Sequence, residues 1–555
     1  MKNLIVSALL LSIISISCQS PEKTTQKPEV PFLWENANVY FLLTDRFQNG
    51  NAENDINFNR TEECGLLRGF EGGDFKGITQ KIKEGYFTDL GITALWFSPV
   101  VEQIHGAVDE GTGLTYAFHG YWAKDWTAFE PNFGTEQEFA ELVEAAHAKG
   151  MRVLMDVVIN HTGPVTQKDP VWPEGWVRQQ PQCKYSDYES TVSCTLVENL
   201  PDVLTGTDEE VEIPAQLLEK WEAEGRLEKE VSELDAFFSA TGYPRTPRYY
   251  IIKWLTDFIR KYGIDGYRLD TTKHTEEDVW GDLWKEAVKA FAEWKEANPD
   301  KVLDNNDFFM VGEVYGYGIS GDRLYNFGDK QVDYFNYGMK SLINFDFKGD
   351  ANKAYEELFS LYSAKLNGPL KGQSVLNYIT SHDDGYPYDK EREKTIEAGT
   401  KLLLCPGASQ VYYGDESGRS LIIEGAVGDA NLRSLMNWED LQNNTEIHGI
   451  PAKDILVHYQ KLGKFRSEHP AVGAGVHTMI QESPYYFKRE YTNGDFKDIV
   501  VVGLDLAKGE KIIPVEEGVF NEGEELVDSY SGIKVKVKNG VVKLNSEYNI
   551  VLLSK

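Results

Sequence analysis

Short apolar runs alternate with amphipathic segments along most of this chain, and the alternation predicts its fold class. The apolar runs have the length of buried strands, and the segments between them have the 3.6-residue period of helices. Strands that alternate with helices form parallel sheets with crossover connections. About eight such units favour an α/β fold of the (β/α)8 TIM-barrel type over an open sheet. The predicted strands are 39–47, 94–100, 152–160, 266–270, 308–314, 375–383 and 410–416, with 332–338 as the weakest candidate.

The clearest predicted helix begins at Thr135. Thr135 and Glu138 have the spacing of a capping box, which satisfies free backbone N–H groups at a helix start. Phe139 begins an apolar stripe at helical spacing, and Gly150 marks the end of the helix.

Two segments interrupt the alternation and divide the chain into domains. Residues 162–245 are rich in Pro, Gly and charged residues, follow the third predicted strand, and indicate an inserted subdomain. From residue 463 onward, short β runs separated by turn signals predict a C-terminal antiparallel β-sandwich domain. The predicted division is a signal peptide at 1–17, a tether at 18–33, the barrel at 34–161 and 246–462, the inserted subdomain at 162–245, and the β domain at 463–555.

The N-terminus has the features of an export signal. Lys2 precedes an apolar run that is too short for a membrane-spanning helix. The run ends in "SISC", which resembles the lipid-attachment signal of bacterial lipoproteins, with Cys18 as the lipidated residue. That signal usually has Leu where this chain has Ser15, so plain secretion stays open. We expect a protein that is exported and either lipid-anchored to the cell envelope or secreted, with no transmembrane helix in the mature chain.

Composition narrows the choice of partner. The chain has 56 Lys and Arg against 88 Asp and Glu among 555 residues, a formal net charge of −32. Such a charge argues against nucleic acid or an anionic membrane surface as a partner. It is compatible with a neutral substrate, and equally with a need for solubility.

Export places the cysteines in an oxidising compartment. Cys183 and Cys194 are close enough in sequence to close a small loop by a disulfide, worth roughly 3 kcal/mol in the chain-entropy model. Cys64 and Cys405 have no obvious partner, and the apolar surroundings of Cys405 predict burial.

Polar residues gather where the predicted strands end, which is the functional rim of a TIM barrel. Arg268 and Asp270 lie two apart in a strand and therefore on one face, so the guanidinium favours the ionised carboxylate that a nucleophile needs. An Arg-x-Asp pair in a strand is more often a structural ion pair, and by itself it assigns no function. Convergence of such residues from separate units is harder to attribute to structure. The residues at the predicted rim are Asp156, Asn160, His161, Arg268, Asp270, Glu313, His382 and Asp383.

Four motifs resemble the conserved regions of glycoside hydrolase family 13, the α-amylase family. They are "DVVINH" (156–161), "GYRLDTTKH" (266–274), "GEV" (312–314) and "SHDD" (381–384), and "HGYW" (119–122) and "LPDV" (200–203) match two further signatures in the expected order. The resemblance covers roughly residues 36–555. Within the family, the chain looks most like the exported α-amylases of the bacterial periplasmic kind. The resemblance itself implies the barrel, the insertion and the C-terminal β domain.

The resemblance also implies roles for individual residues. Asp270 matches the nucleophile, Glu313 the general acid/base, and Asp383 the carboxylate that supports the transition state. The cleaved sugar's site is lined at the matching positions Tyr121, His161, Arg268, His274 and His382, with Lys273 on the leaving-group side.

The same resemblance implies two calcium sites. Calcium takes six to eight oxygen ligands, which carboxylates, amides and backbone carbonyl groups provide. The first set resembles a site of cyclodextrin glucanotransferases and some amylases, and consists of Asn49, Asn51, Asn54, Asp55, Gly72 and Asp74. An Asn- and Gly-rich turn of this kind is usually only a turn. The second set ties the inserted subdomain to the barrel and consists of Asn160, Asp202 and the carbonyl of His274.

The resemblance therefore implies an exported, retaining, endo-acting α-1,4-glucan hydrolase that degrades starch, glycogen or maltodextrins, and so an enzyme of carbohydrate metabolism. Two alternatives stay open: a transglycosylase of the same family that makes cyclodextrins or longer maltooligosaccharides, and a non-catalytic glycan-binding surface protein. The second is disfavoured because all three carboxylates are present.

Overall fold

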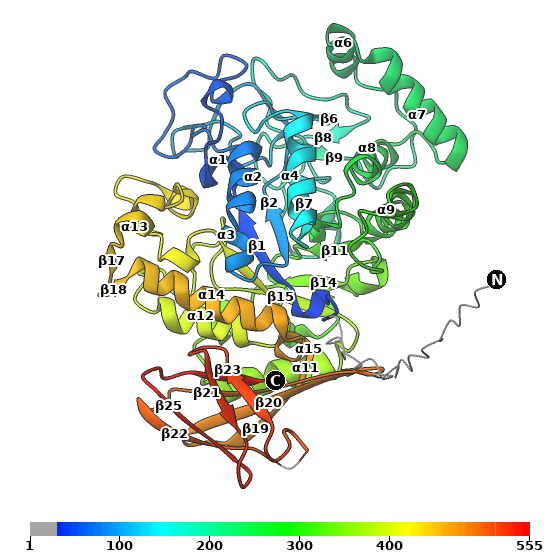
Figure 1. The fold of residues 1–555 in the computed structure, drawn as a ribbon. Coiled ribbons are helices and arrows are strands. Elements are labelled where there is room, and N and C mark those ends of the chain that lie inside the picture. The colour runs from blue at the N-terminus through cyan, green and yellow to red at the C-terminus, as the bar shows by residue number, and fades with distance from the viewer. Residues whose placement is uncertain (1–29, 517) are drawn as a thin grey trace, which may run out of the picture.

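A closed barrel of eight parallel strands forms the centre of the molecule in the computed structural model, which describes residues 30–516 and 518–555 (Figure 1). The strands are buried on both faces, which is why they appear in the sequence as continuous apolar runs. The α/β barrel prediction is confirmed. In spatial order the strands are β1 (Asn38–Leu42), β16 (Ala408–Tyr412), β15 (Ser374–Tyr378), β14 (Ser341–Asn344), β11 (Phe309–Gly312), β10 (Gly266–Leu269), β7 (Arg152–Val157) and β2 (Ala94–Phe97).

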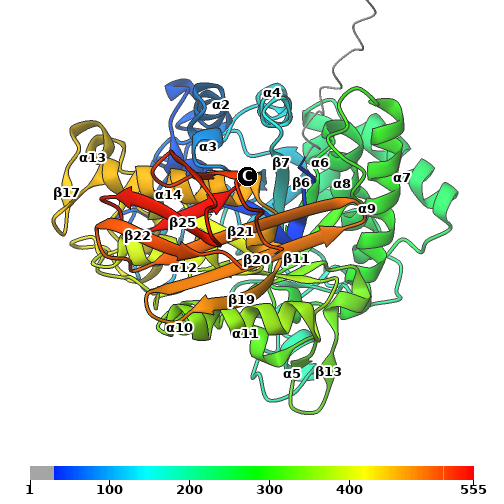
Figure 2. The ribbon, with the colours of Figure 1, turned by 60° about the horizontal axis from the view of Figure 1, so that its bottom comes forward.

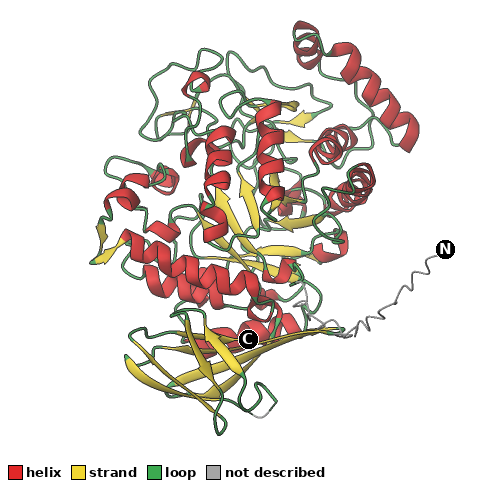
Figure 3. Ribbon diagram, viewed as in Figure 1, coloured by secondary structure: helices red, strands yellow, loops and turns green. Residues whose placement is uncertain are grey.

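Helices cover the outside of the barrel (Figure 3). The capping box predicted at Thr135 and Glu138 is present at the start of α4. The main covering helices are α2 (Phe75–Glu84), α4 (Glu136–Ala148), α8 (Pro247–Tyr262), α9 (Glu277–Ala297), α11 (Tyr355–Asn367), α12 (Thr395–Leu404) and α14 (Ala452–Glu468).

The weakest strand prediction, 332–338, is wrong. Residues Gln331–Val332 form β13, which pairs with β12 (Tyr325–Asn326) in a small hairpin outside the barrel, and a 3-10 helix follows at Tyr334–Tyr337. The missing barrel strand is β14, whose sequence "SLIN" holds only two apolar residues between polar ends. A strand this short gives almost no periodic signal, and only pairing with β11 and β15 identifies it.

The segment 162–245 lies between β7, the third barrel strand, and α8, as the sequence predicts. It holds the short strands β8 (Val177–Arg178) and β9 (Asp202–Val203) and the helices α5 (Glu189–Val192), α6 (Ala215–Ala223) and α7 (Leu227–Thr241). In Figure 1, α6 and α7 project away from the barrel beside α8. The predicted disulfide joins Cys183 to Cys194, whereas Cys64 and the buried Cys405 are free thiols.

The C-terminal part is an antiparallel β structure of two layers (Figure 2). A six-stranded sheet and a two-stranded sheet enclose a core of their own, to which Val501 and Leu526 contribute from the first sheet and Ile513 and Val542 from the second. Residue 463 falls inside α14, and the first strand of the sheet begins at Val476. The strands are β19 (Val476–Gln481), β20 (Tyr485–Asn493), β21 (Phe496–Leu504), β22 (Gly509–Pro514), β23 (Glu525–Asp528), β24 (Ile533–Lys536), β25 (Val541–Ser546) and β26 (Val551–Ser554).

The predicted signal peptide, Cys18 and the tether as far as residue 29 lie outside the described residues. Within 30–516 and 518–555, no helix has the length and apolar character needed to cross a membrane.

Candidate active site

Barrel register places the main polar residues next to one another. Arg268 of β10 lies opposite Asp156 of the neighbouring β7, and β11 flanks β10 on its other side. Asp270 directly follows β10, and Glu313 directly follows β11. Because the strands are parallel and their ends are level, these side chains meet at the same rim of the barrel.

The Arg268 guanidinium contacts three carboxyl groups from three strands. Its Nη1 donates to Asp270 Oδ1 at 2.7 Å and to Asp156 Oδ1 at 2.9 Å, and its Nη2 lies 3.2 Å from Glu313 Oε2. The side chains of Arg268, Asp270 and Glu313 are 2%, 9% and 8% exposed. One buried cation therefore holds Asp270 and Glu313 side by side while each stays open to the rim on a narrow face.

Glu313 lies where its acid form is favoured. Burial raises its pKa from 4.5 to about 8, and the negative charges of Asp270 and Asp383 add to that effect, against the opposing influence of Arg268. The backbone N–H of Thr271 also donates to Glu313 Oε2 at 2.8 Å and fixes the carboxyl group's orientation. The carboxyl group is thus placed to give up a proton, whereas Asp270 directly accepts a charge-assisted hydrogen bond from a guanidinium.

The loop after β15 adds His382 and Asp383. The His382 ring stacks on Tyr121, with centroids 5.1 Å apart and planes at 19°. Asp383, 36% exposed, accepts a hydrogen bond from the Ser381 hydroxyl at 2.9 Å, and one of its oxygens lies 3.8 Å from His382 Nε2. Burial lowers the pKa of His382 to about 4, so its ring is neutral near pH 7.

The other predicted sugar-site residues lie close by. His161 Nε2 is 3.1 Å from the carbonyl oxygen of Tyr121, and burial lowers the pKa of His161. His274 Nδ1 is 3.0 Å from the carbonyl oxygen of Thr191 in the inserted segment, and burial lowers its pKa to about 4. Lys273 Nζ donates to the carbonyl oxygen of Tyr315, two residues after Glu313, at 2.9 Å.

Asp156, predicted to lie at the rim, supports other rim residues. Besides Arg268, it accepts hydrogen bonds from the Tyr121 hydroxyl at 2.8 Å and from the Trp96 indole N–H at 3.0 Å. Asp156 thereby fixes the orientation of both Arg268 and Tyr121. In the sequence, Asp156 is marked by its place at the end of a buried strand and as the first residue of "DVVINH", but its partners come from segments distant in sequence.

The first predicted calcium set forms one cluster of oxygen donors. The Asn49 side-chain amide donates from Nδ2 to Asp55 Oδ1 at 2.9 Å, and the backbone of Gly72 is packed against both so closely that a Cβ there would lie 2.7 Å from Asp55 Oδ1. Asn54 Oδ1 is buried and has no hydrogen-bond partner within the described chain. Burying an unpaired oxygen costs free energy unless the oxygen coordinates a cation. These residues fit a calcium ion, which prefers oxygen ligands.

Two residues of this set also cap helices. The Asp74 carboxylate accepts hydrogen bonds from the backbone N–H groups of Gly50, Asn51 and Gly77, and it caps the N-terminus of α2. The Asn51 side chain caps the short 3-10 helix at Ala52–Asn54.

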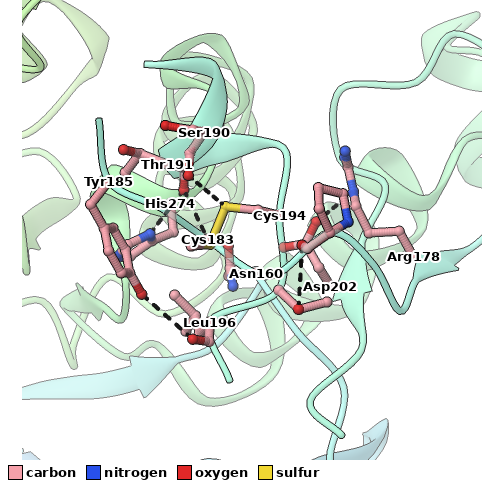
Figure 4. The surroundings of a disulfide bond; sticks show 12 residues. Asn160, Arg178, Cys183, Tyr185, Ser190, Thr191, Cys194, Leu196, Asp202 and His274 are labelled. Carbon is pink, nitrogen blue, oxygen red and sulfur yellow. Dashed lines mark hydrogen bonds and ion pairs between the residues drawn. A yellow bond between two sulfur atoms is a disulfide. The ribbon is translucent and has the colours of Figure 1, made fainter. Parts of the chain in front are cut away.

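The second predicted calcium set does not fit an ion as it is placed (Figure 4). The carboxylate of Asp202, 3% exposed, pairs with the guanidinium of Arg178 at 2.8 Å. The amide of Asn160 lies beside His161, with Nδ2 3.4 Å from the ring Nδ1. A guanidinium already neutralises the one carboxylate of the set, and its charge would repel a divalent cation. No group of three or more His, Cys, Asp and Glu side chains suited to a metal occurs in residues 30–516 and 518–555.

Comparison with known proteins agrees with this geometry. The profile described as the α-amylase catalytic domain matches residues 41–475. A periplasmic α-amylase from Escherichia coli (strain K12) is 34% identical over 537 residues, which cover 86% of this chain and 74% of that protein. A cyclomaltodextrin glucanotransferase from Geobacillus stearothermophilus is 27% identical over 84% of this chain and 59% of its own length.

Solved structures show the same fold. The crystal structure of an Anoxybacillus α-amylase matches with a TM-score of 0.64 and 22% identity, covering 94% of this chain and 99% of that one. That of an α-amylase from Geobacillus thermoleovorans, complexed with acarbose, matches with a TM-score of 0.64 and 20% identity over 94% and 99% of the two chains. Barrel, rim residues and family profile agree: the chain belongs to the α-amylase family of glycoside hydrolases, family 13.

Proposed function

We propose that this protein is an exported α-amylase that cleaves internal α-1,4 bonds of α-glucans with retention of configuration. The observation that carries the proposal is that the Arg268 guanidinium forms ion pairs with both Asp270 and Glu313 at one barrel rim. Retaining glycosidases need two carboxyl groups about 5–5.5 Å apart, one to attack and one to protonate the leaving oxygen.

In the first step Asp270 attacks the anomeric carbon while Glu313 gives its proton to the glycosidic oxygen. The bond to the leaving sugar breaks, and a glycosyl–Asp270 ester forms. Esterification removes the negative charge of Asp270, so the pKa of Glu313 falls and the carboxyl group becomes a base. Glu313 then takes a proton from water, water attacks the anomeric carbon, and the ester bond breaks to regenerate Asp270.

The neighbouring residues bind the sugar through these steps. Asp383 supports the positive charge that develops on the ring, and it accepts hydrogen bonds from hydroxyl groups. Tyr121 offers a flat face to the ring, and the neutral His161, His274 and His382 exchange hydrogen bonds with hydroxyl groups. Lys273 binds on the leaving-group side, where Glu313 delivers its proton.

Export is proposed from residues 1–17, with residues 18–33 as a tether and Cys18 as the site of a lipid anchor. The relation to a periplasmic enzyme supports export. The domain limits at 161/162 and 245/246 are also proposed, whereas the limit predicted at 462/463 falls inside α14. For calcium we propose the cluster at Asn49, Asn51, Asn54, Asp55, Gly72 and Asp74, which stabilises the loop ahead of α2; at Asp202 the arginine supplies the positive charge instead.

The test is the product profile on maltoheptaose, soluble starch and cyclodextrins. Shorter linear sugars that first appear as the α-anomer support the proposal. Longer or cyclic products would instead assign the transglycosylase function suggested by the relation to a cyclomaltodextrin glucanotransferase. The E313Q variant should lose about 10²- to 10⁴-fold in kcat and still bind maltoheptaose, whereas a pure binding protein has no turnover to lose.

A further inference from the structure

Tyr386 is a tyrosine that the proposed mechanism does not use. Its side chain is 86% exposed, more than any other large hydrophobic side chain in residues 30–516 and 518–555. Tyr386 lies three residues after Asp383 in the loop that follows β15. Three residues span at most about 10 Å, so the ring lies near the candidate catalytic rim.

The backbone around Tyr386 is held in place. Its N–H donates to Asp384 Oδ1 at 3.1 Å, and the Asp384 carboxylate is buried. The other oxygen of Asp384 accepts the Tyr378 hydroxyl at 2.8 Å and pairs with Lys348. Pro387 follows and restricts the backbone of Tyr386 further. The exposed ring is thus carried by an anchored turn.

A cavity of about 500 Å³ lies against Tyr386. Its lining includes both aromatic and polar side chains: Phe345, Tyr386 and Tyr388 are the aromatic ones, and Asp346, Lys348 and Asn352 are among the polar ones. Asp346 Oδ2 accepts hydrogen bonds from the Ser320 hydroxyl at 2.6 Å and from the Ser320 N–H at 3.1 Å, which fix the orientation of this carboxylate in the cavity wall. Sugar rings combine an apolar face with a rim of hydroxyl groups, and this cavity offers complements to both.

The cavity is linked to the leaving-group side of the site. Its wall residue Phe345 contacts Tyr315, with ring centroids 4.9 Å apart. Tyr315 is 51% exposed, lies two residues after Glu313, and accepts the hydrogen bond from Lys273. The exposed Tyr315 and the partly buried Phe345 therefore lie between the candidate acid/base and the cavity that Tyr386 lines.

We propose that this cavity, with Tyr386 as its stacking face, binds a glucose unit of the leaving-group part of an α-glucan chain, an inference that rests on the proposed function. Tyr386 then decides how many sugar units lie beyond the cleaved bond. Glucans long enough to reach the cavity gain affinity from it, and short ones do not.

The test follows bond cleavage in maltoheptaose labelled at its reducing end, which is the leaving-group end. In the Y386A variant the labelled fragments should become shorter by about one glucose unit. The ratio of kcat/KM for maltoheptaose to kcat/KM for maltotriose should fall about three- to tenfold. Y386W keeps a flat ring and should restore both properties. Y548A removes another exposed tyrosine in the C-terminal domain, and it should change neither.

An unchanged fragment distribution in Y386A would overturn the inference, as would an equal loss on both substrates with a lowered melting temperature. If the wild-type protein cleaves no α-glucan, the proposed function fails instead. Calorimetric titration of wild type and Y386A with maltoheptaose then tests the cavity by itself: equal affinities reject it, and weaker binding by Y386A supports it.

Discussion

The pKa of Glu313 should fall when the negative charge of Asp270 is removed. Both carboxyl groups contact the Arg268 guanidinium, so they lie close together in a buried environment. At the roughly 5.5 Å that retaining enzymes keep between their two carboxyl groups, one charge at an effective dielectric constant of about 20 contributes on the order of 3 kcal/mol. That energy corresponds to about two pKa units.

In the D270N variant we therefore expect the pKa of Glu313 to fall from about 8 to roughly 6. The measurement is a 13C NMR titration of labelled glutamate, with the D270N/E313Q spectrum subtracted to isolate one carboxyl group. D495N, in the C-terminal β domain, is the matched control and should leave that titration unchanged. The same fall should accompany formation of the glycosyl ester, which is why one residue can act as acid and then as base.

The wild-type enzyme offers a second measurement of the same property. The first step needs protonated Glu313, so kcat/KM should fall as pH rises through about 8. A Glu313 pKa that stays at about 8 in D270N would show that Asp270 does not contribute to the shift. An alkaline limb near the ordinary glutamate value of 4.5 would refute the argument from burial.

Three further predictions concern stability. The C183S/C194S variant should lose about 3 kcal/mol of unfolding free energy, because the disulfide no longer restricts the unfolded loop; denaturant titration measures it, and a loss under 1 kcal/mol would contradict it. The D55N and N54A variants should reduce the rise in melting temperature on adding calcium to EGTA-treated protein, and an unchanged rise would exclude this cluster as the site. The R178Q variant leaves the buried Asp202 carboxylate unpaired, which should lower the free energy of unfolding by about 3 kcal/mol. Calorimetry should show that added calcium restores part of that free energy. An equal response to calcium in variant and wild type would contradict the conclusion that Arg178 neutralises Asp202.

Most of the fold is predictable from the sequence alone. Strands buried on both faces must be continuously apolar, so seven of the eight barrel strands are visible as runs, and the positions where they end identify Asp270 and Glu313. The strand β14 was missed because its two apolar residues are too few for any periodic signal. The Cys183–Cys194 pairing was predictable because the two residues are close in sequence and few other pairings were open.

Side-chain partners were decided by the tertiary structure. That one guanidinium serves Asp156, Asp270 and Glu313 depends on the register between β7, β10 and β11, and no single segment encodes it. The pairing of Asp202 with Arg178 depends on the course of the inserted loop. Because of this pairing, the second predicted calcium set does not suit an ion. Local sequence determines where a strand or turn can form because backbone preference and burial are local properties. Which charges meet depends on how distant segments pack, and at this site that packing determines the chemistry.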